Sequence, residues 1–302
     1  MPVLREETAG LLFALAGFAL FSVGDVFVKS IVDEWPAPAI AALRYVLGAL
    51  VLMIALLAFE GRRGFVLPGA GWQILRGVGV GISSMAFFSA LQVMPLATAT
   101  SIAFTSPIMT ALLAAVLLRE PMRWATWIAS FAAFGGVLLV LKPSISTIGL
   151  AALLPLLAAF GMAMLLVGNR AVAGRASALS MQFSVALTAM LVLGPIVALG
   201  HLGVIPGPNV AVPHWSVVAT CAVIAVLASC AHMLVYLGTT RAGAATIAPM
   251  AYVQLLIAGL FGWLLFGERP DATALVGAAI IVAAGLYLWR SGRVADEPQG
   301  TD

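Results

Sequence analysis

The chain has 302 residues, of which 63% are hydrophobic and only 9% are charged, and its formal net charge is +3. Soluble domains carry about a quarter charged residues, so a chain this apolar cannot cover a water-exposed surface with polar groups. The composition therefore excludes an ordinary soluble protein. The scattered basic residues also argue against a nucleic-acid partner, which is bound by a basic stripe or patch.

The first apolar run covers residues 9–28 and predicts a membrane helix. The core of a cleaved signal peptide is shorter, at roughly 7–15 residues, and its leader is positively charged. Here Glu6 and Glu7 precede the run. We therefore interpret it as the first transmembrane span and not as a signal peptide.

Turn residues and charges divide the chain into ten apolar runs, and a bilayer core of about 30 Å needs about 20 residues per helix. The third run contains Gly77, Gly79 and Gly81, which predict close packing against another helix. The sequence thus predicts an all-α integral membrane protein whose consecutive helices are antiparallel neighbours. The predicted spans are residues 9–30, 37–59, 73–93, 96–118, 122–141, 148–168, 177–199, 214–238, 244–266 and 271–289.

The basic residues predict the orientation, because cytoplasmic loops carry an excess of lysine and arginine. With the amino terminus inside, eleven basic residues fall on inner loops and helix ends. Only Lys29, Lys142 and Arg269 fall outside, and Arg44 lies within a span. We expect a multi-pass protein of a bacterial-type inner (plasma) membrane with both termini in the cytoplasm.

The two halves of the chain resemble each other at an offset of 148 residues, which becomes 149 near the end. Ala97-Thr98 recurs as Ala245-Thr246, residues 117–120 recur as 265–268, and residues 136–139 recur as 285–288. The pattern predicts two five-helix repeats, residues 9–141 and 148–290. Because five is odd, the second repeat must be inverted in the membrane, an architecture that recurs in secondary transporters.

These features resemble the ten-helix EamA family of the drug/metabolite transporter superfamily. The resemblance rests on three groups of residues, namely Ser106-Pro107 through Pro121 with its echo at 262–268, the glycines Gly135, Gly136 and Gly285, and Asp25 with Lys29 ahead of Arg44. It implies two five-helix halves around a central cavity. It also implies cargo such as amino acids, nucleotide-sugar-like compounds, vitamins, other metabolites or drugs.

The second half departs from the first where Leu255 stands in place of a counterpart to Pro107, and it carries Pro249 instead. This variant resembles a bacterial subgroup that is often assigned riboflavin or S-adenosylmethionine uptake. No substrate is taken from that likeness.

Three charged residues near the outer ends of the first two spans form the leading candidate site. A charge within the hydrocarbon costs roughly 2.5–3.5 kcal/mol on insertion scales, so it needs a partner, a wet cavity or a function. Asp25 and Arg44 lie at similar depths, about 9 Å and 12 Å at helical rise, so they can pair across the hairpin, and Lys29 lies one turn above Asp25. Two interpretations stay open, a substrate or proton site and a structural ion pair.

A second candidate cluster is polar and aromatic. Tyr252 and Gln254 stand in the ninth span, and the matching stretch of the fourth span carries Phe104, Thr105 and Ser106. Gln182 stands in the seventh span where the second has Arg44. Such groups in an apolar cavity suit a small planar or zwitterionic solute. The alternative is that they make hydrogen bonds between packed helices.

The predicted function is secondary transport of small organic metabolites by alternating access. The alternatives are a channel or facilitator and, from another class, a membrane-embedded enzyme. An enzyme would need converging nucleophiles, carboxylates or metal ligands, and the three histidines and two cysteines show no such cluster. Glu120 and Glu268, at opposite faces, are interpreted as structural cap residues. We expect no catalytic residue, metal or cofactor. The expected partners are the substrate and membrane lipid, with a coupling proton and a homodimer left open.

Overall fold

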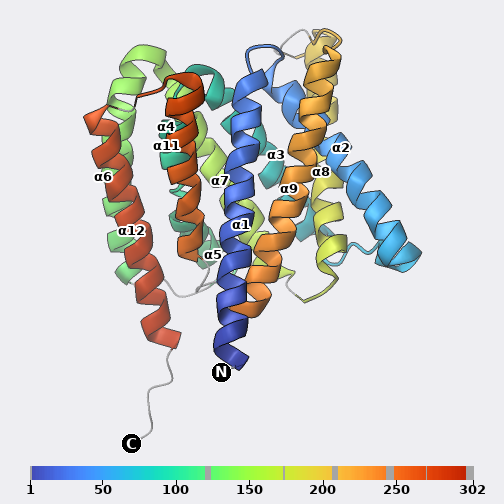
Figure 1. The fold of residues 1–302 in the computed structure, drawn as a ribbon, viewed down its shortest axis with the longest axis horizontal. Helices are drawn as coiled ribbons and strands as arrows, with labels where there is room; N and C mark the ends of the chain where they lie inside the picture. Colours follow the sequence, from blue (N-terminus) through green and yellow to red (C-terminus); the bar gives the residue numbers. More distant parts are fainter. Residues whose placement is uncertain are drawn as a thin grey trace, which may run out of the picture.

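The structure, a computed structural model, describes residues 2–119, 124–172, 174–205, 210–242, 248–269 and 271–296. Within these ranges the chain forms helices and connecting turns, with no β-strand. Figure 1 shows a bundle of helices in which α1 begins and α12 ends at the same end of the molecule. Glu120 lies outside the described residues.

The helices follow the predicted spans closely. In the first half they are α1 (Pro2–Ile31), α2 (Ala37–Phe59), η1 (Gly61–Gly64), α3 (Ala70–Val93), α4 (Leu96–Ala103), α5 (Ser106–Leu117) and α6 (Trp124–Ile148). In the second half they are η2 (Gly149–Leu153), α7 (Leu154–Ala171), α8 (Ala178–His201), α9 (Trp215–Ala242), η3 (Ala248–Tyr252), α11 (Val253–Phe266) and α12 (Ala272–Asp296).

Among the described residues, seven helical segments are long and apolar enough to cross a membrane, and three shorter apolar segments accompany them. The shorter ones are Trp127–Leu141, Met250–Phe266 and Ala272–Tyr287. Each falls within a predicted span, as do the cores of the seven longer ones. The prediction of an all-α, multi-pass membrane protein is therefore confirmed.

The fourth predicted span is interrupted, because α4 ends at Ala103 and α5 begins at Ser106. Pro107 has no N–H to bond the carbonyl of Ala103, and its ring crowds the preceding turn. At the break, the N–H of Thr105 instead bonds the carbonyl of Ile102 at 3.0 Å, one residue nearer than in an α-helix. The ninth span changes at Tyr252 from the 3-10 helix η3 directly into the α-helix α11.

Glycines bring helices from the two halves into close contact. The most extensive helix contacts pair α1 with α9, α3 with α7, and α6 with α12. A Cβ atom on Gly79 would lie 2.6 Å from the carbonyl oxygen of Gly161, so the α3–α7 backbones meet with no side chain between them. Gly77 likewise has no room for a Cβ beside Thr188. Close packing in the third span is thus confirmed for Gly77 and Gly79, whereas Gly81 makes an ordinary contact with Leu193.

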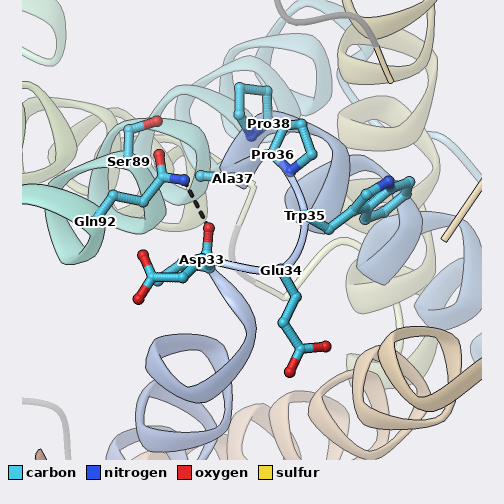
Figure 2. A pocket seen from close by; sticks show the side chains of 9 residues that line it. Asp33, Glu34, Trp35, Pro36, Ala37, Pro38, Ser89 and Gln92 are labelled. Carbon is cyan, nitrogen blue, oxygen red and sulfur yellow. Dashed lines mark hydrogen bonds between the residues drawn. The ribbon is translucent and has the colours of Figure 1, made fainter. Parts of the chain in front are cut away.

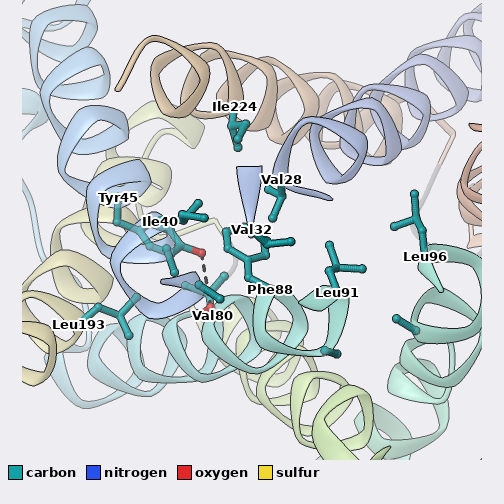
Figure 3. Close-up of a cluster of buried hydrophobic side chains, with 14 of the residues drawn as sticks. Val28, Val32, Ile40, Tyr45, Val80, Phe88, Leu91, Leu96, Leu193 and Ile224 are labelled. Carbon is teal, nitrogen blue, oxygen red and sulfur yellow. Dashed lines mark hydrogen bonds between the residues drawn. The ribbon is translucent and has the colours of Figure 1, made fainter. Parts of the chain in front are cut away.

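The core lies where α1, α2, α3 and α9 converge (Figure 3). Val28, Ile40 and Leu91 are fully buried there. The outward faces are also apolar, since Phe59 is 83% exposed and Trp124 is 82% exposed. Apolar side chains on both the inside and the outside are what a helix bundle surrounded by lipid requires.

The α6–α12 contact predicts opposite effects for two neighbouring glycines. A Cβ on Gly136 would lie 2.8 Å from the carbonyl oxygen of Gly277, whereas a Cβ on Gly135 meets nothing within 4 Å. Gly136→Ala should lower the free energy of unfolding by about 1–3 kcal/mol through overpacking. Gly135→Ala should leave it unchanged or raise it by up to about 1 kcal/mol through helix propensity. Thermal unfolding in detergent measures both, and equal effects would contradict the close contact.

Candidate functional site

Lys29 joins the two halves of the chain at the end of the bundle that the basic residues predict to be outside, which we call the outer end. Its Nζ atom lies 3.1 Å from Oε1 of Glu268, and the two side chains are only 15% and 13% exposed. The same ammonium donates to the carbonyls of Leu91 at 2.6 Å and Met94 at 3.0 Å. These carbonyls end α3, where the helix dipole is negative and attracts a cation. Lys29 is therefore held by three oxygens from two segments.

Glu268 is fixed from its own side as well. Its Oε2 atom accepts a hydrogen bond of 2.7 Å from the backbone N–H of Leu96, in the first turn of α4. Its backbone N–H bonds the carbonyl of Gly262 at 3.0 Å, and Gly267 takes the left-handed conformation with φ +64°. The N–H of Gly267 bonds the carbonyl of Trp263 at 3.2 Å, which is the αL ending of an α-helix. We call the contact among Lys29, Glu268, the end of α3 and the start of α4 the outer junction.

Lys29 lies one turn above Asp25 and could share its carboxylate. The structure turns it instead toward Glu268 and the carbonyls of α3. Three oxygens, two at the end of α3 and one on Glu268, satisfy an ammonium better than one carboxylate on the same helix.

Arg44 does not form the ion pair that was expected across the hairpin of the first two spans. Its guanidinium lies 4.5 Å from the centre of the Tyr45 ring and 5.6 Å from that of Phe88. Nη1 donates to Oγ of Ser84 at 3.2 Å. Among the described residues, no ion pair within 4 Å joins Arg44 to Asp25. The aromatic faces attract the cation in place of the carboxylate.

Asp25 remains in the interior without a direct partner. No hydrogen bond or ion pair to a described residue is made by its carboxylate, although Arg44 is near enough for the two charges to interact. Both side chains are partly exposed, while Val28 on the same helix is fully buried. The two charges thus lie near each other on α1 and α2 without forming an ion pair.

Phe104 lies between α4 and α5, and Tyr252 lies where η3 meets α11. The centres of their rings are 5.3 Å apart. The Tyr252 hydroxyl donates to the carbonyl of Val282 in α12 at 3.2 Å, and Gly285 leaves the room that the hydroxyl needs. The ring therefore contacts Phe104, while its polar end is held by α12.

The other three predicted polar residues do not join this pair. The Thr105 hydroxyl donates to the carbonyl of Ile102 at 2.8 Å in its own turn. Gln254 accepts a hydrogen bond at 3.0 Å from Ser22 of α1, through its backbone and not its side chain. Gln182 is partly buried near the start of α8, at the end of the bundle away from Arg44.

A buried arginine near the start of α3 forms a second polar centre. Arg76 in α3 is 2% exposed. It donates from Nε to Oδ1 of Asn169 in α7 at 2.6 Å, from Nη2 to the carbonyl of Met181 in α8 at 3.4 Å, and from Nη1 to Gln73. No carboxylate among the described residues lies within 4 Å of it. We call this contact the inner junction. The only sign of the inner junction in the sequence was a basic residue inside the third span, three residues after Gln73.

A cavity of about 500 Å³ opens beside the α1–α2 turn at the outer end (Figure 2). Trp35 and Pro36 form part of its wall, and Gln92 of α3 reaches across to donate to the carbonyl of Val32 at 2.7 Å. The carboxylates of Asp33 and Glu34 are exposed at the cavity. Among the described residues, no group of three or more metal-binding side chains is found here or elsewhere.

Comparison with known proteins gives consistent matches along the whole chain. The family model described as "EamA-like transporter family" matches residues 8–142 and again residues 149–290. An S-adenosylmethionine uptake transporter of Rickettsia prowazekii is 25% identical over 94% of both chains. A riboflavin transporter of Rhizobium johnstonii is 28% identical over 95% of this chain and 92% of its own.

Two further matches are an exporter and a solved structure. A pseudopaline exporter of Pseudomonas aeruginosa is 27% identical over 96% of this chain and 99% of its own. One solved crystal structure has a TM-score of 0.60 and 20% identity, and it covers 95% of this chain and 99% of its own. At that identity the structural match supports the fold alone.

The outer junction predicts energetic coupling between Lys29 and Glu268. Lys29→Met and Glu268→Leu should each lower the free energy of unfolding, because each leaves the other charge without its counterion. The double variant should lose less than the sum, with a coupling of about 1 kcal/mol or more. Thermal unfolding in detergent measures the cycle.

A matched cycle of Lys29→Met with Glu34→Gln provides the control, since Glu34 is exposed in the adjacent turn. Strict additivity in the Glu268 cycle would show that the ion pair contributes nothing to the fold.

Proposed function

This chain belongs to the EamA-like transporter family, and on that premise we propose that it carries small organic metabolites across a membrane by alternating access. The family and the named relatives are transporters of small molecules and not enzymes. The finer elements of the proposal are the carrier mechanism, the orientation, the coupling ion and the site.

One observation carries the proposal of alternating access, namely that the outer junction links the two halves through an ion pair. Lys29 belongs to the first half and Glu268 to the second, and their atoms are 3.1 Å apart. A carrier must make and break contacts between its halves on each side of the membrane in turn. Water can solvate an ammonium and a carboxylate when such a contact opens, which makes a polar junction reversible. The inner junction around Arg76 provides the corresponding polar contact at the other end.

The packing supports two inverted repeats. Under a two-fold relation that exchanges α1 with α7 and α3 with α9, the α1–α9 contact maps onto the α3–α7 contact, and both are extensive. The α2–α8 and α6–α12 contacts map onto themselves. Phe104 and Tyr252 stand 148 positions apart, which is the repeat offset, yet their rings touch. Equivalent residues that touch must lie near the axis that relates them.

We further propose that the protein lies in a bacterial-type inner membrane with both termini in the cytoplasm. The excess of basic residues on the predicted inner loops supports this orientation. The shared end of α1 and α12 in Figure 1 agrees with an even number of spans. The exposed apolar faces, with Phe59 and Trp124 among them, would then contact lipid.

For the coupling ion we propose a proton carried by Asp25. Asp25 is the one carboxylate placed within the apolar part of a described span, and it has no ion-pair partner there. Intramembrane carboxylates that face water-accessible space are the usual carriers of protons in transporters.

The function is tested by flux in proteoliposomes, with S-adenosylmethionine and riboflavin as the first solutes because relatives are named for them. A carrier should show counterflow, in which solute on the far side accelerates entry of labelled solute. Uptake that is fast but indifferent to solute on the far side would indicate a channel and contradict alternating access.

The variant Asp25→Asn tests proton coupling separately from solute exchange. At saturating solute this variant should still show counterflow, although more weakly than the wild type, and should lose accumulation driven by a pH gradient altogether, because exchange need not move the proton. Asp33→Asn, a change in the exposed turn beyond α1, should retain both. Undiminished accumulation in Asp25→Asn would exclude this carboxylate as the proton carrier.

The orientation is tested by single cysteines in a background without Cys221 and Cys230. Val212→Cys, at a position that is 95% exposed, should react with an impermeant maleimide added outside intact cells. Arg62→Cys and Arg175→Cys should react only after the membrane is opened. External labelling at Arg175→Cys would reverse the proposed orientation.

A further inference from the structure

Three neighbours hold Arg44 in position, and most of its N–H donors have no partner among the described residues. Tyr45 and Phe88 lie against the guanidinium, and Ser84 accepts one hydrogen bond at 3.2 Å. Ser84 is itself bonded to the Tyr45 hydroxyl at 2.7 Å, and that hydroxyl reaches the carbonyl of Val80 at 3.4 Å. A guanidinium has five N–H donors. Only one of them is used by a described residue.

The other two interior cations are satisfied quite differently. Lys29 has a carboxylate and two carbonyls, and Arg76 has acceptors from three helices and is 2% exposed. Arg44 alone of the three combines partial exposure with unused donors. It is held rigidly, yet no described anion is bound to it.

Asp25 supplies the opposite charge on the facing helix. It lies six residues before the end of α1, and Arg44 lies seven residues after the start of α2. At helical rise both are therefore about 9–11 Å below the outer helix ends. The two charges interact but form no ion pair, and both side chains are partly exposed. Glu268 neutralises Lys29, so Arg44 remains as the cation that acts on Asp25.

From this arrangement we propose that Asp25 and Arg44 bind the two ends of a zwitterion, such as the ammonium and carboxylate of an α-amino-acid group. The proposal rests on the transport function above and names the substrate class of that site. The planar fork of a guanidinium matches a carboxylate through two parallel hydrogen bonds. The carboxylate of Asp25 accepts the ammonium.

The same geometry selects against other solutes. A neutral ligand that displaced water from the site would leave both charges desolvated without partners, which is costly in a low-dielectric interior. A solute with only an ammonium would leave Arg44 uncompensated. Discrimination therefore comes from the charges left unpaired as much as from those that are paired.

The test measures binding to the purified full-length protein by thermal shift and by isothermal titration. L-Methionine and S-adenosylmethionine carry the free amino-acid group. L-Methionine methyl ester, N-acetyl-L-methionine and 5′-methylthioadenosine lack the carboxylate, the ammonium and the whole group, respectively. Wild-type protein should bind at least one of the two zwitterions, and should bind the corresponding blocked or truncated compounds at least about tenfold more weakly.

Two variants assign the selectivity to the site. Arg44→Gln should weaken zwitterion binding about tenfold or more and leave the weak binding of the methyl ester unchanged. Arg241→Gln is the matched control, because it removes another arginine that lies over an aromatic ring, 4.8 Å from the centre of Phe13. It should bind like the wild type.

The wild-type ligand series does not depend on any variant folding. Equal binding of zwitterions and blocked compounds, or no binding of either zwitterion, would overturn the proposal. Counterflow of riboflavin by a protein that ignores both zwitterions would overturn this substrate class and leave the transporter function intact. Loss of all counterflow would instead contradict the proposed function.

Discussion

A charge inside this bundle must be satisfied by a neighbouring group, by water or by a ligand, because lipid surrounds the helices and supplies no hydrogen bonds. The outer junction shows how this constraint organises the fold. One ammonium, on Lys29, gathers the end of α3 and the carboxylate of Glu268, and that carboxylate in turn holds the start of α4. Segments far apart in the sequence are thereby fixed at one end of the molecule.

In the part of the chain that the structure describes, three interior cations meet this constraint in three ways, and the differences suggest different roles. Lys29 uses an ion pair between the halves, which can open and be hydrated. Arg76 uses amide, carbonyl and thioether acceptors in a site that is closed to solvent. Arg44 uses aromatic faces and one hydroxyl, and keeps donors available. In the proposed carrier, Lys29 and Arg76 make the polar contacts between the halves at the two ends, and Arg44 keeps the donors that bind the substrate.

Much of the fold could be predicted from the sequence, because hydrophobic run length and the position of basic residues directly reflect the bilayer. The spans and the close packing at Gly79 followed from such local signals. The partners of Lys29 could not, since a pairing 239 positions away along the chain depends on how the halves dock. The same is true of Arg44, whose aromatic neighbour Phe88 lies on another helix. Depth along a helix predicts which groups can meet, and packing decides which of them do.

The central claim is that the outer junction opens and closes during transport, and spin-label distances measure this most directly. Labels at Val93, at the end of α3, and at Arg269, after Glu268, report on the junction in protein reconstituted into nanodiscs and free of native cysteine. The account predicts two distance populations, with Glu268→Leu shifting the balance toward the longer one because the ion pair no longer favours closure. A single distance that is unchanged by Glu268→Leu would contradict it.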